Sequence, residues 1–212
     1  ISPQNEPFFF AHGTLNVGEA MAPAVIRRVK TLVDPQAINI IDASPGTSCP
    51  VIETVNDTDV VVLVTEPTPF GLNDLKLAVN MSLKKKIPTC IVINRSEGAD
   101  ELISDYAKKV GVPIAGRIPF DRKYAESYSS GTILTHIYPD FREKLLHIFS
   151  AVSSLAGSVP PDVPPDELLP LSAENLEPFP RGESSRYSAL RTAGIPRSRN
   201  LPRKPAISLS TP

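Results

Sequence analysis

Two short apolar runs with a crossover between them constrain the fold of this chain more than any other feature. Residues 38–41 form the first run, which stops on Asp42, and residues 60–65 form the second, which stops on Glu66. Continuous apolar runs bounded by turn signals are typical of parallel strands buried on both faces. Ligands bind beyond the carboxyl ends of such strands. The sequence therefore predicts a site near Asp42 and near Gly46 in the loop that follows.

Strand and helix patterns alternate along the rest of this region. Residues 89–94 form a third apolar run that ends on Asn94, and residues 112–118 form a fourth that leads into Pro119. Apolar side chains recur at helical spacing between these runs. The expected helices span residues 23–33, 71–86, 100–110, 122–129 and 139–150, and residues 8–11 are a further candidate strand. This alternation predicts an α/β fold in which helices flank a parallel sheet.

The composition changes near residue 151. Eleven of the 23 prolines stand at Pro160 or later, and residues 181–212 are rich in Arg. Such a segment cannot bury enough apolar surface to offset its ordering entropy. We therefore expect one domain over residues 1–150 and a disordered Pro/Arg-rich tail over residues 151–212. The tail is interpreted as a solvated extension, with an acidic partner or a shifted reading frame as alternatives.

Charge and hydropathy exclude several classes of partner. The formal net charge of -1 gives no electrostatic reason to expect nucleic acid. No stretch reaches the roughly 18 consecutive apolar residues of a membrane span, and no signal-peptide pattern opens the chain. Cys49 and Cys90 are too few for a disulfide framework and suggest a reducing, cytoplasmic location. His12 could activate Cys49 as a nucleophile, but no third orienting group is identifiable.

Four ordered motifs support a family resemblance. They read DASPGTSCPVI at residues 42–52, VTEPTPFGLNDL at 64–75, IVINR at 91–95 and IPFD at 118–121. They resemble the MinD/ParA-type P-loop ATPases, and most closely the branch with an inserted ferredoxin-like iron–sulfur domain. The resemblance spans about residues 8–150. It implies a P-loop NTPase-like fold, ATP and Mg²⁺ as cofactors, and a homodimer of the full-length protein.

The resemblance also assigns roles at the strand ends. It implies that Asp42 holds Mg²⁺ through water and that the backbone of Gly46 senses the γ-phosphate. It implies that Asn94 hydrogen-bonds the adenine edge, while Glu66 and Thr68 shape the nearby loop. The other residues implied at the base pocket are Arg95, Pro119, Phe120 and Asp121. From the residues alone, Asp42 could instead cap its turn, and Asn94 could close a βα turn.

Two features of that family are absent from the 212 residues. No stretch matches G-x-x-x-x-G-K-[ST], the Walker A motif that cradles the phosphates, and two cysteines cannot ligate a four-cysteine cluster. The chain also opens on Ile1. We therefore expect the C-terminal part of a longer ATPase, whose P-loop and iron–sulfur clusters lie upstream, and no ATP hydrolysis by this part alone. The alternative is a non-catalytic interaction module with a degenerate nucleotide-binding fold.

Overall fold

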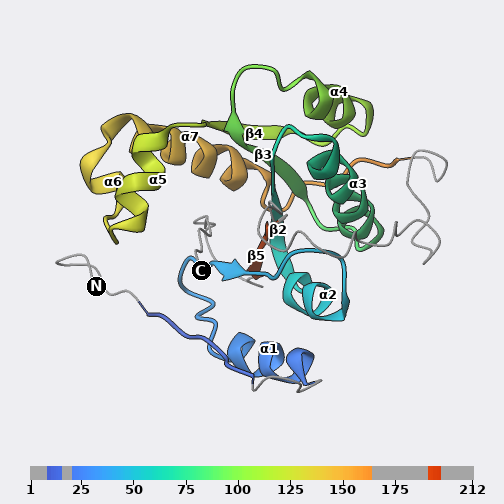
Figure 1. Cartoon of the computed structure of the whole chain (residues 1–212). Helices are drawn as coiled ribbons and strands as arrows, with labels where there is room; N and C mark the ends of the chain where they lie inside the picture. The colour runs from blue at the N-terminus through green and yellow to red at the C-terminus, as the bar shows by residue number, and fades with distance from the viewer. Residues whose placement is uncertain (1–8, 16–20, 164–190, 197–212) are drawn as a thin grey trace, which may run out of the picture.

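The computed structural model describes residues 9–15, 21–163 and 191–196 (Figure 1). In these residues a five-stranded sheet has the order β1-β5-β2-β3-β4. The strands are β1 (Ile41–Asp42), β2 (Thr58–Thr65), β3 (Thr89–Ser96), β4 (Ile114–Pro119) and β5 (Arg191–Pro196). The helices are α1 (Ala22–Lys30), α2 (Cys49–Val55), α3 (Pro69–Lys84), α4 (Glu101–Lys109), α5 (Arg122–Ser129), α6 (Leu134–Ile137) and α7 (Pro139–Leu155).

Three neighbouring strands form the parallel part of the sheet. β2 pairs parallel with β3, and β3 pairs parallel with β4. The connections between them run through α3 and α4, as βαβ units require. The predicted α/β fold, with a parallel sheet flanked by helices, is confirmed in this part of the molecule.

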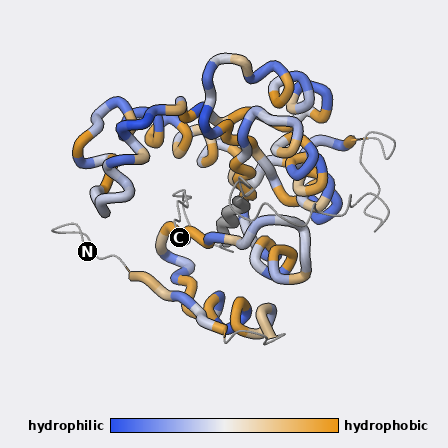
Figure 2. The backbone as a smooth tube through the Cα atoms, in the orientation of Figure 1, coloured by the Kyte–Doolittle hydropathy of each residue, from blue (hydrophilic) through white to orange (hydrophobic). Residues whose placement is uncertain are grey.

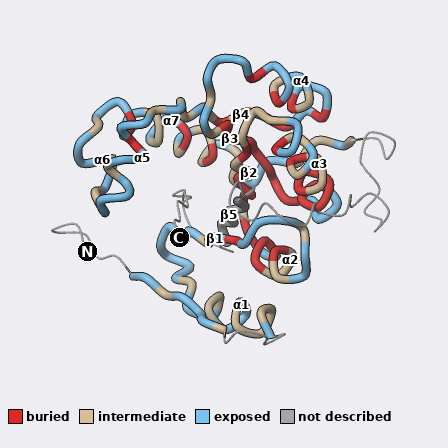
Figure 3. The backbone as a smooth tube through the Cα atoms, viewed as in Figure 1, coloured by how far each residue is buried: buried red, intermediate tan, exposed pale blue. Residues whose placement is uncertain are grey.

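Side chains of β2 alternate between two apolar cores. Val61 and Leu63 lie in the core shared with α2, α3 and α4, whereas Val60 and Val62 lie in the core shared with α7. Figure 3 shows buried segments along β2 and β3 and on the helices that flank them. Apolar and polar residues alternate along α3, α4 and α7 (Figure 2), as expected of helices that each bury one face. Burial on both sides explains why residues 60–65 of β2 are all β-branched or aliphatic.

The first apolar run is not the buried strand that the sequence predicts. Only Ile41 and Asp42 of this region form β1, and β5 lies between β1 and β2, antiparallel to both. Ile38 and Ile40 remain 42% and 49% exposed. Residues 38–41 therefore lack the cover on two faces that an apolar parallel strand needs.

The candidate strand at residues 8–11 is wrong in its described part. Residues 9–11 have no regular secondary structure, and Phe8 lies outside the described residues. Phe9 and Phe10 are 71% and 70% exposed. An apolar run without a neighbouring strand does not form a sheet element, because its backbone groups find no partner.

Helix α1 is attached to α2 by polar contacts. No residue of α1 is buried. Lys30 Nζ donates hydrogen bonds to the backbone carbonyl oxygens of Glu53 and Thr54, at 3.0 and 3.3 Å, and also to that of Asn56. Arg27 Nη1 lies 3.1 Å from Glu53 Oε2. A cation at the carboxyl end of α2 is favourable because the last carbonyl groups of a helix lack partners within it.

The region beyond residue 150 differs from the predicted tail in two places. α7 continues to Leu155, and Arg191–Pro196 form β5 inside the range expected to lack secondary structure. Residues 164–190 and 197–212 lie outside the described residues, so the division into 1–150 and 151–212 stays a prediction. Within the part of the chain that the structure describes, no helix is long and apolar enough to cross a membrane.

An aromatic cluster joins α5 to α7 and contains one hydrogen-bonded acid. The ring of Tyr124 lies 5.1 Å from that of Tyr138 and 4.9 Å from that of Phe141. Its hydroxyl donates a hydrogen bond to Asp140 Oδ2 at 2.7 Å. This hydrogen bond lowers the pKa of Asp140, and desolvation raises the pKa of Tyr124 to about 12. The phenol therefore remains a donor, and the carboxylate an acceptor, at neutral pH.

The burial pattern predicts unequal costs for truncating the two apolar runs. Leu63 is fully buried, so we expect Leu63→Ala to lower the free energy of unfolding by about 2–5 kcal/mol. Ile40 is half-exposed, so we expect Ile40→Ala to cost about 1 kcal/mol or less. Urea unfolding followed by circular dichroism measures both. Equal costs would contradict the placement of residues 38–41 outside the core.

The Asp140 contact predicts a loss of stability in acid. Because the folded pKa of Asp140 lies below its ordinary value of about 3.9, its stabilising contribution is present above that pH and is lost as the pH falls through the folded pKa. We expect Asp140→Asn to lower the melting temperature near neutral pH and to differ less from the wild type in acid. Asp105→Asn, at an exposed position of α4, is the control. A difference that is constant with pH would argue against this role of Asp140.

Candidate functional site

The carboxyl ends of β2, β3 and β4 meet at one edge of the sheet. In the parallel register Thr65 stands beside Ile93, and Ile93 beside Arg117. Glu66 and Asn94 follow Thr65 and Ile93 directly in the chain. Parallel strands deliver such residues to the same edge, which is where ligands bind in open α/β sheets. We call the side chains in the last residues of these three strands, and directly after them, the carboxyl edge.

Arg95 connects both sides of the carboxyl edge. Its Nη1 lies 3.5 Å from Glu66 Oε2, which follows β2. Its guanidinium carbon lies 5.0 Å from the ring centroid of Phe120, which follows β4. The contacts of one arginine on β3 therefore extend to the ends of both neighbouring strands.

The backbone of Arg95 is strained, and its contacts only offset that strain. Its φ of 54° lies in the left-handed region, which costs a residue other than glycine roughly 1–2 kcal/mol. The Arg95 side chain is 55% exposed, so its ion pair with Glu66 contributes at most about 1 kcal/mol. The contact with Phe120 contributes about 0.5–1 kcal/mol. Little net stability results from these contacts, and Arg95 shares its left-handed backbone with Asp57 and Lys86 among the described residues other than glycine.

The turn between β2 and α3 places a helix N-terminus at the carboxyl edge. Thr68 Oγ1 accepts a hydrogen bond from the backbone N–H of Gly71, and Thr65 Oγ1 donates one to the carbonyl oxygen of Gly71, both at 3.0 Å. A Cβ atom at Gly71 would lie 2.3 Å from the carbonyl oxygen of Glu66, so this close turn requires glycine. Pro69 has no N–H group and the N–H of Gly71 is bonded to Thr68, so the dipole of α3 is the main attraction for anionic groups at this point.

The two residues that follow β4 differ in exposure and in hydrogen bonding. Phe120 is 48% exposed beside Arg95. The side chain of Asp121 caps α5 by accepting a hydrogen bond from the backbone N–H of Lys123 at 2.9 Å, and Lys123 Nζ lies 3.0 Å from Asp121 Oδ2. The hydrogen bond from Lys123 lowers the pKa of Asp121. Asp121 thus has a structural role at α5, and the base-pocket roles of Asp121 and Pro119 stay predictions.

Asp42 and Gly46 lie apart from the carboxyl edge. Asp42 pairs with Ala193, which also pairs with Val62, so Asp42 is level with the middle of β2. Two strands separate β1 from β3, a distance of about 14 Å at roughly 4.8 Å per strand. Gly46 has a φ of 94° in the loop after Asp42, and no described atom lies within 4 Å of the place that its Cβ would occupy. The structure therefore brings Asn94, but not Asp42, to the carboxyl edge.

The described residues offer no complete metal or cluster site. No group of three His, Cys, Asp or Glu side chains could hold a metal ion among them. Mg²⁺ on a nucleotide needs only one or two carboxylates, because phosphate and water oxygens supply the other ligands. The Mg²⁺ role of Asp42 stays a prediction, because a single carboxylate of this kind is compatible with such an ion without indicating one. Cys49 is exposed, whereas Cys90 is buried in the α7-side core, where desolvation raises its pKa to about 12.

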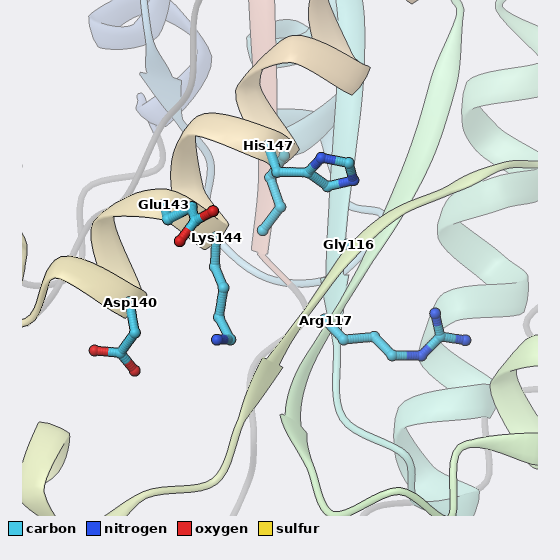
Figure 4. A pocket seen from close by; sticks show the side chains of 7 residues that line it. Gly116, Arg117, Asp140, Glu143, Lys144 and His147 are labelled. Carbon is cyan, nitrogen blue, oxygen red and sulfur yellow. The ribbon is translucent and has the colours of Figure 1, made fainter.

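An open hollow of about 380 Å³ lies between β4 and α7, on the face of the sheet opposite α3 (Figure 4). The residues that line it are Gly116, Arg117, Asp140, Glu143, Lys144, His147 and Ile148. Figure 4 shows the Arg117 side chain pointing away from Lys144. Asp140 is engaged with Tyr124. The charged groups therefore do not converge on one point, as those of a built ligand site do.

Sequence reasoning missed a polar cluster next to Arg95. Ser96, Asp100 and Arg117 are joined by hydrogen bonds. Asp100 stands at the expected start of a helix, where an acidic residue is ordinary. An arginine inside the otherwise apolar run at residues 112–118 was the signal that could have indicated the cluster.

Comparison with known proteins finds partial matches. No family model matches the chain, and no solved structure does. An uncharacterised protein of Methanocaldococcus jannaschii is 36% identical over 121 residues, which are 56% of this chain and 42% of that protein. An uncharacterised ATP-binding protein of the same organism is 28% identical over 124 residues, 57% and 47% of the two chains. An iron-sulfur cluster carrier protein of Pyrococcus horikoshii is 31% identical over 110 residues, 43% and 36%.

The chain spans less than half the length of each of these relatives. One relative is named for binding ATP and another for carrying iron–sulfur clusters. These matches support the resemblance to the MinD/ParA-type superfamily. They do not distinguish the branch with the ferredoxin-like insert from the rest of that superfamily.

The strain at Arg95 predicts an unusual order of stability among its variants. Glycine normally weakens a strand, but it adopts the left-handed region without the steric cost that alanine meets. We expect Arg95→Gly to exceed Arg95→Ala in free energy of unfolding by about 1 kcal/mol. Both variants lose the contacts with Glu66 and Phe120, so the difference between their free energies of unfolding isolates the conformational cost of the backbone at residue 95. At Arg117, which is not among the residues with a positive φ, we expect the Ala variant to be more stable than the Gly variant. Urea unfolding of Arg95→Gly, Arg95→Ala, Arg117→Gly and Arg117→Ala measures all four free energies.

Proposed function

We propose that this chain forms the adenine side of a nucleotide-binding site in a MinD/ParA-type ATPase that is linked to iron–sulfur or electron-transfer chemistry. The observation that carries the proposal is the carboxyl edge, where Arg95 holds Glu66 on one side and Phe120 on the other. The partial likeness to proteins named as ATP-binding and as iron–sulfur carriers supports it.

The carboxyl edge has the groups that recognition of a purine needs. Asn94 is half-buried at the end of β3, and its amide offers one donor and one acceptor to a base edge. Phe120 presents a half-exposed ring on which a base can stack. Pro119 and Asp121 flank that ring in the chain and complete the proposed pocket. The N-terminus of α3 adds an electrostatic preference for anionic groups nearby.

The phosphate end of the nucleotide needs groups beyond the carboxyl edge. In the proposal Asp42 holds Mg²⁺, which neutralises phosphate charge, and the backbone N–H of Gly46 contacts the γ-phosphate. Gly46 suits this role because its loop is open at the position of a Cβ atom. The Walker A motif is absent from these 212 residues, so we propose that a longer parent protein supplies it and hydrolyses ATP.

The remaining parts of the proposal concern that parent protein. Its iron–sulfur clusters would be held by residues outside this chain, since Cys49 and Cys90 lie in different environments. We further propose that the parent is a cytoplasmic homodimer and that an acidic partner binds the basic residues after position 181, most of which lie outside the described residues.

A second function, a non-catalytic interaction module, is favoured by one observation. Large apolar side chains are exposed among the described residues that precede β1, 9–15 and 21–40. They are Phe9, Phe10, Met21, Leu32, Ile38 and Ile40. Exposed apolar groups in one region mark surfaces that other protein segments cover. In this alternative the α/β body serves to dock a partner.

Titration calorimetry with ATP and Mg²⁺ tests the nucleotide proposal. We expect the chain to bind ATP more tightly than GTP, and Asn94→Ala to weaken ATP binding about tenfold, because one hydrogen-bonded pair is lost. Phe120→Ala should weaken the binding of both nucleotides, since it removes a stacking face. Tyr128→Ala removes a partly exposed aromatic side chain from α5 and is the matched control. We expect no phosphate release by any of these proteins.

Two outcomes would contradict the proposal. Unchanged affinity in both Asn94→Ala and Phe120→Ala would exclude the carboxyl edge as the binding site. An absence of nucleotide binding by the wild-type chain would favour the interaction module instead.

A further inference from the structure

Asp100 forms a buried connection between β3 and β4. It is 4% exposed at the residue preceding α4. Ser96 Oγ donates a hydrogen bond to Asp100 Oδ2 at 2.6 Å, and Arg117 Nε donates one to the same oxygen at 3.0 Å. Ser96 lies at the end of β3 and Arg117 lies in β4, so one carboxylate oxygen holds both strands.

The side chain of Asp100 does not serve its own helix. It occupies the N-cap position of α4, where Asp, Asn and Ser often bond to backbone N–H groups, but it makes no such bond. Its Oδ1 atom is buried and has no hydrogen-bond partner among the described residues. Burying a carboxylate with one oxygen unsatisfied is costly. A residue that only began α4 would not require that burial.

The connection lies where the sheet itself is irregular. The register between β3 and β4 shifts between Ile93 and Ser96, which is the part of β3 that contains Asn94 and Arg95. Beyond the shift, the backbone N–H of Phe120 donates to the carbonyl oxygen of Ser96 at 3.1 Å. Asp100 therefore fixes the same Ser96 that holds the backbone of Phe120.

We propose that Asp100 is a positioning residue, which sets the separation between Arg95 and Phe120 at the carboxyl edge and so the width of the base site. The inference rests on the proposed function. It assigns to Asp100 no contact with the ligand. Arg117 supports the same geometry, because its Nη2 also donates to Ser104 Oγ of α4 at 3.0 Å.

A single tryptophan provides the readout for this role. The chain contains no Trp, so Phe120→Trp places one indole at the carboxyl edge. In that background Asp100→Asn should raise the accessibility of the indole to acrylamide before any ligand is added. It should also weaken binding of ADP with Mg²⁺, measured by quenching of the indole, by about tenfold. Asp105→Asn makes the same chemical change at an exposed position of α4 and should alter neither quantity.

Each outcome decides one question. Unchanged indole accessibility or unchanged affinity in Asp100→Asn, with the fold intact by circular dichroism, would overturn the positioning role. If Asp100→Asn does not fold, Ser96→Ala removes one hydrogen bond of the same connection and should give smaller shifts of the same sign; no shift would overturn the role. If the Phe120→Trp protein and the wild type bind no nucleotide while accessibility still rises in Asp100→Asn, the proposed function fails and the control of Phe120 by Asp100 stands.

Discussion

Burial of β2 and β3 on both faces is the constraint from which the rest of the structure follows. Val61 and Leu63 point into one apolar core, and Val60 and Val62 into the other, so neither face of the central strands can carry polar chemistry. At roughly 1.5–3 kcal/mol for each fully buried aliphatic side chain, these two cores outweigh any surface ion pair of the molecule. Polar side chains of these strands can therefore gather only where the strands end, and Glu66 and Arg95 gather there beside the ring of Phe120.

The parts of the fold that sequence could predict are those with a local signal. The apolar runs at residues 60–65 and 89–94 are long, β-branched and bounded by turns, and both are strands. The run at residues 38–41 has the same composition but lacks neighbours that would bury it. The strand beside it, β5, contains Gly194 and Pro196, which argue against a strand in any local prediction. Tertiary context decided both cases.

The candidate site, like the fold, has parts that the sequence predicts and parts that depend on tertiary contacts. The placement of Asn94 and Arg95 at a strand end follows from a one-dimensional pattern, and the resemblance supplied their expected roles. The ion pair of Arg95 with Glu66 and the connection from Ser96 through Asp100 to Arg117 join different elements. The spacing of residues in the sequence does not predict such contacts, because they depend on strand register and on a local shift in that register. For the same reason the motif at Asp42 could be found in the sequence, whereas its distance from Asn94 could not.

The position of β5 ties the stability of the N-terminal region to the far end of the chain. Among the described residues β1 pairs with β5, through Ile41 with Gly194 and Asp42 with Ala193. Closing a loop of about 150 residues costs roughly 4 kcal/mol in chain entropy, more than two residue pairs recover. The longer pairing of β5 with β2 must offset that cost first. The pairing of β1 therefore depends on the pairing of β5 with β2. Any local opening that releases β5 from β2 also detaches β1 and the loop that contains Gly46.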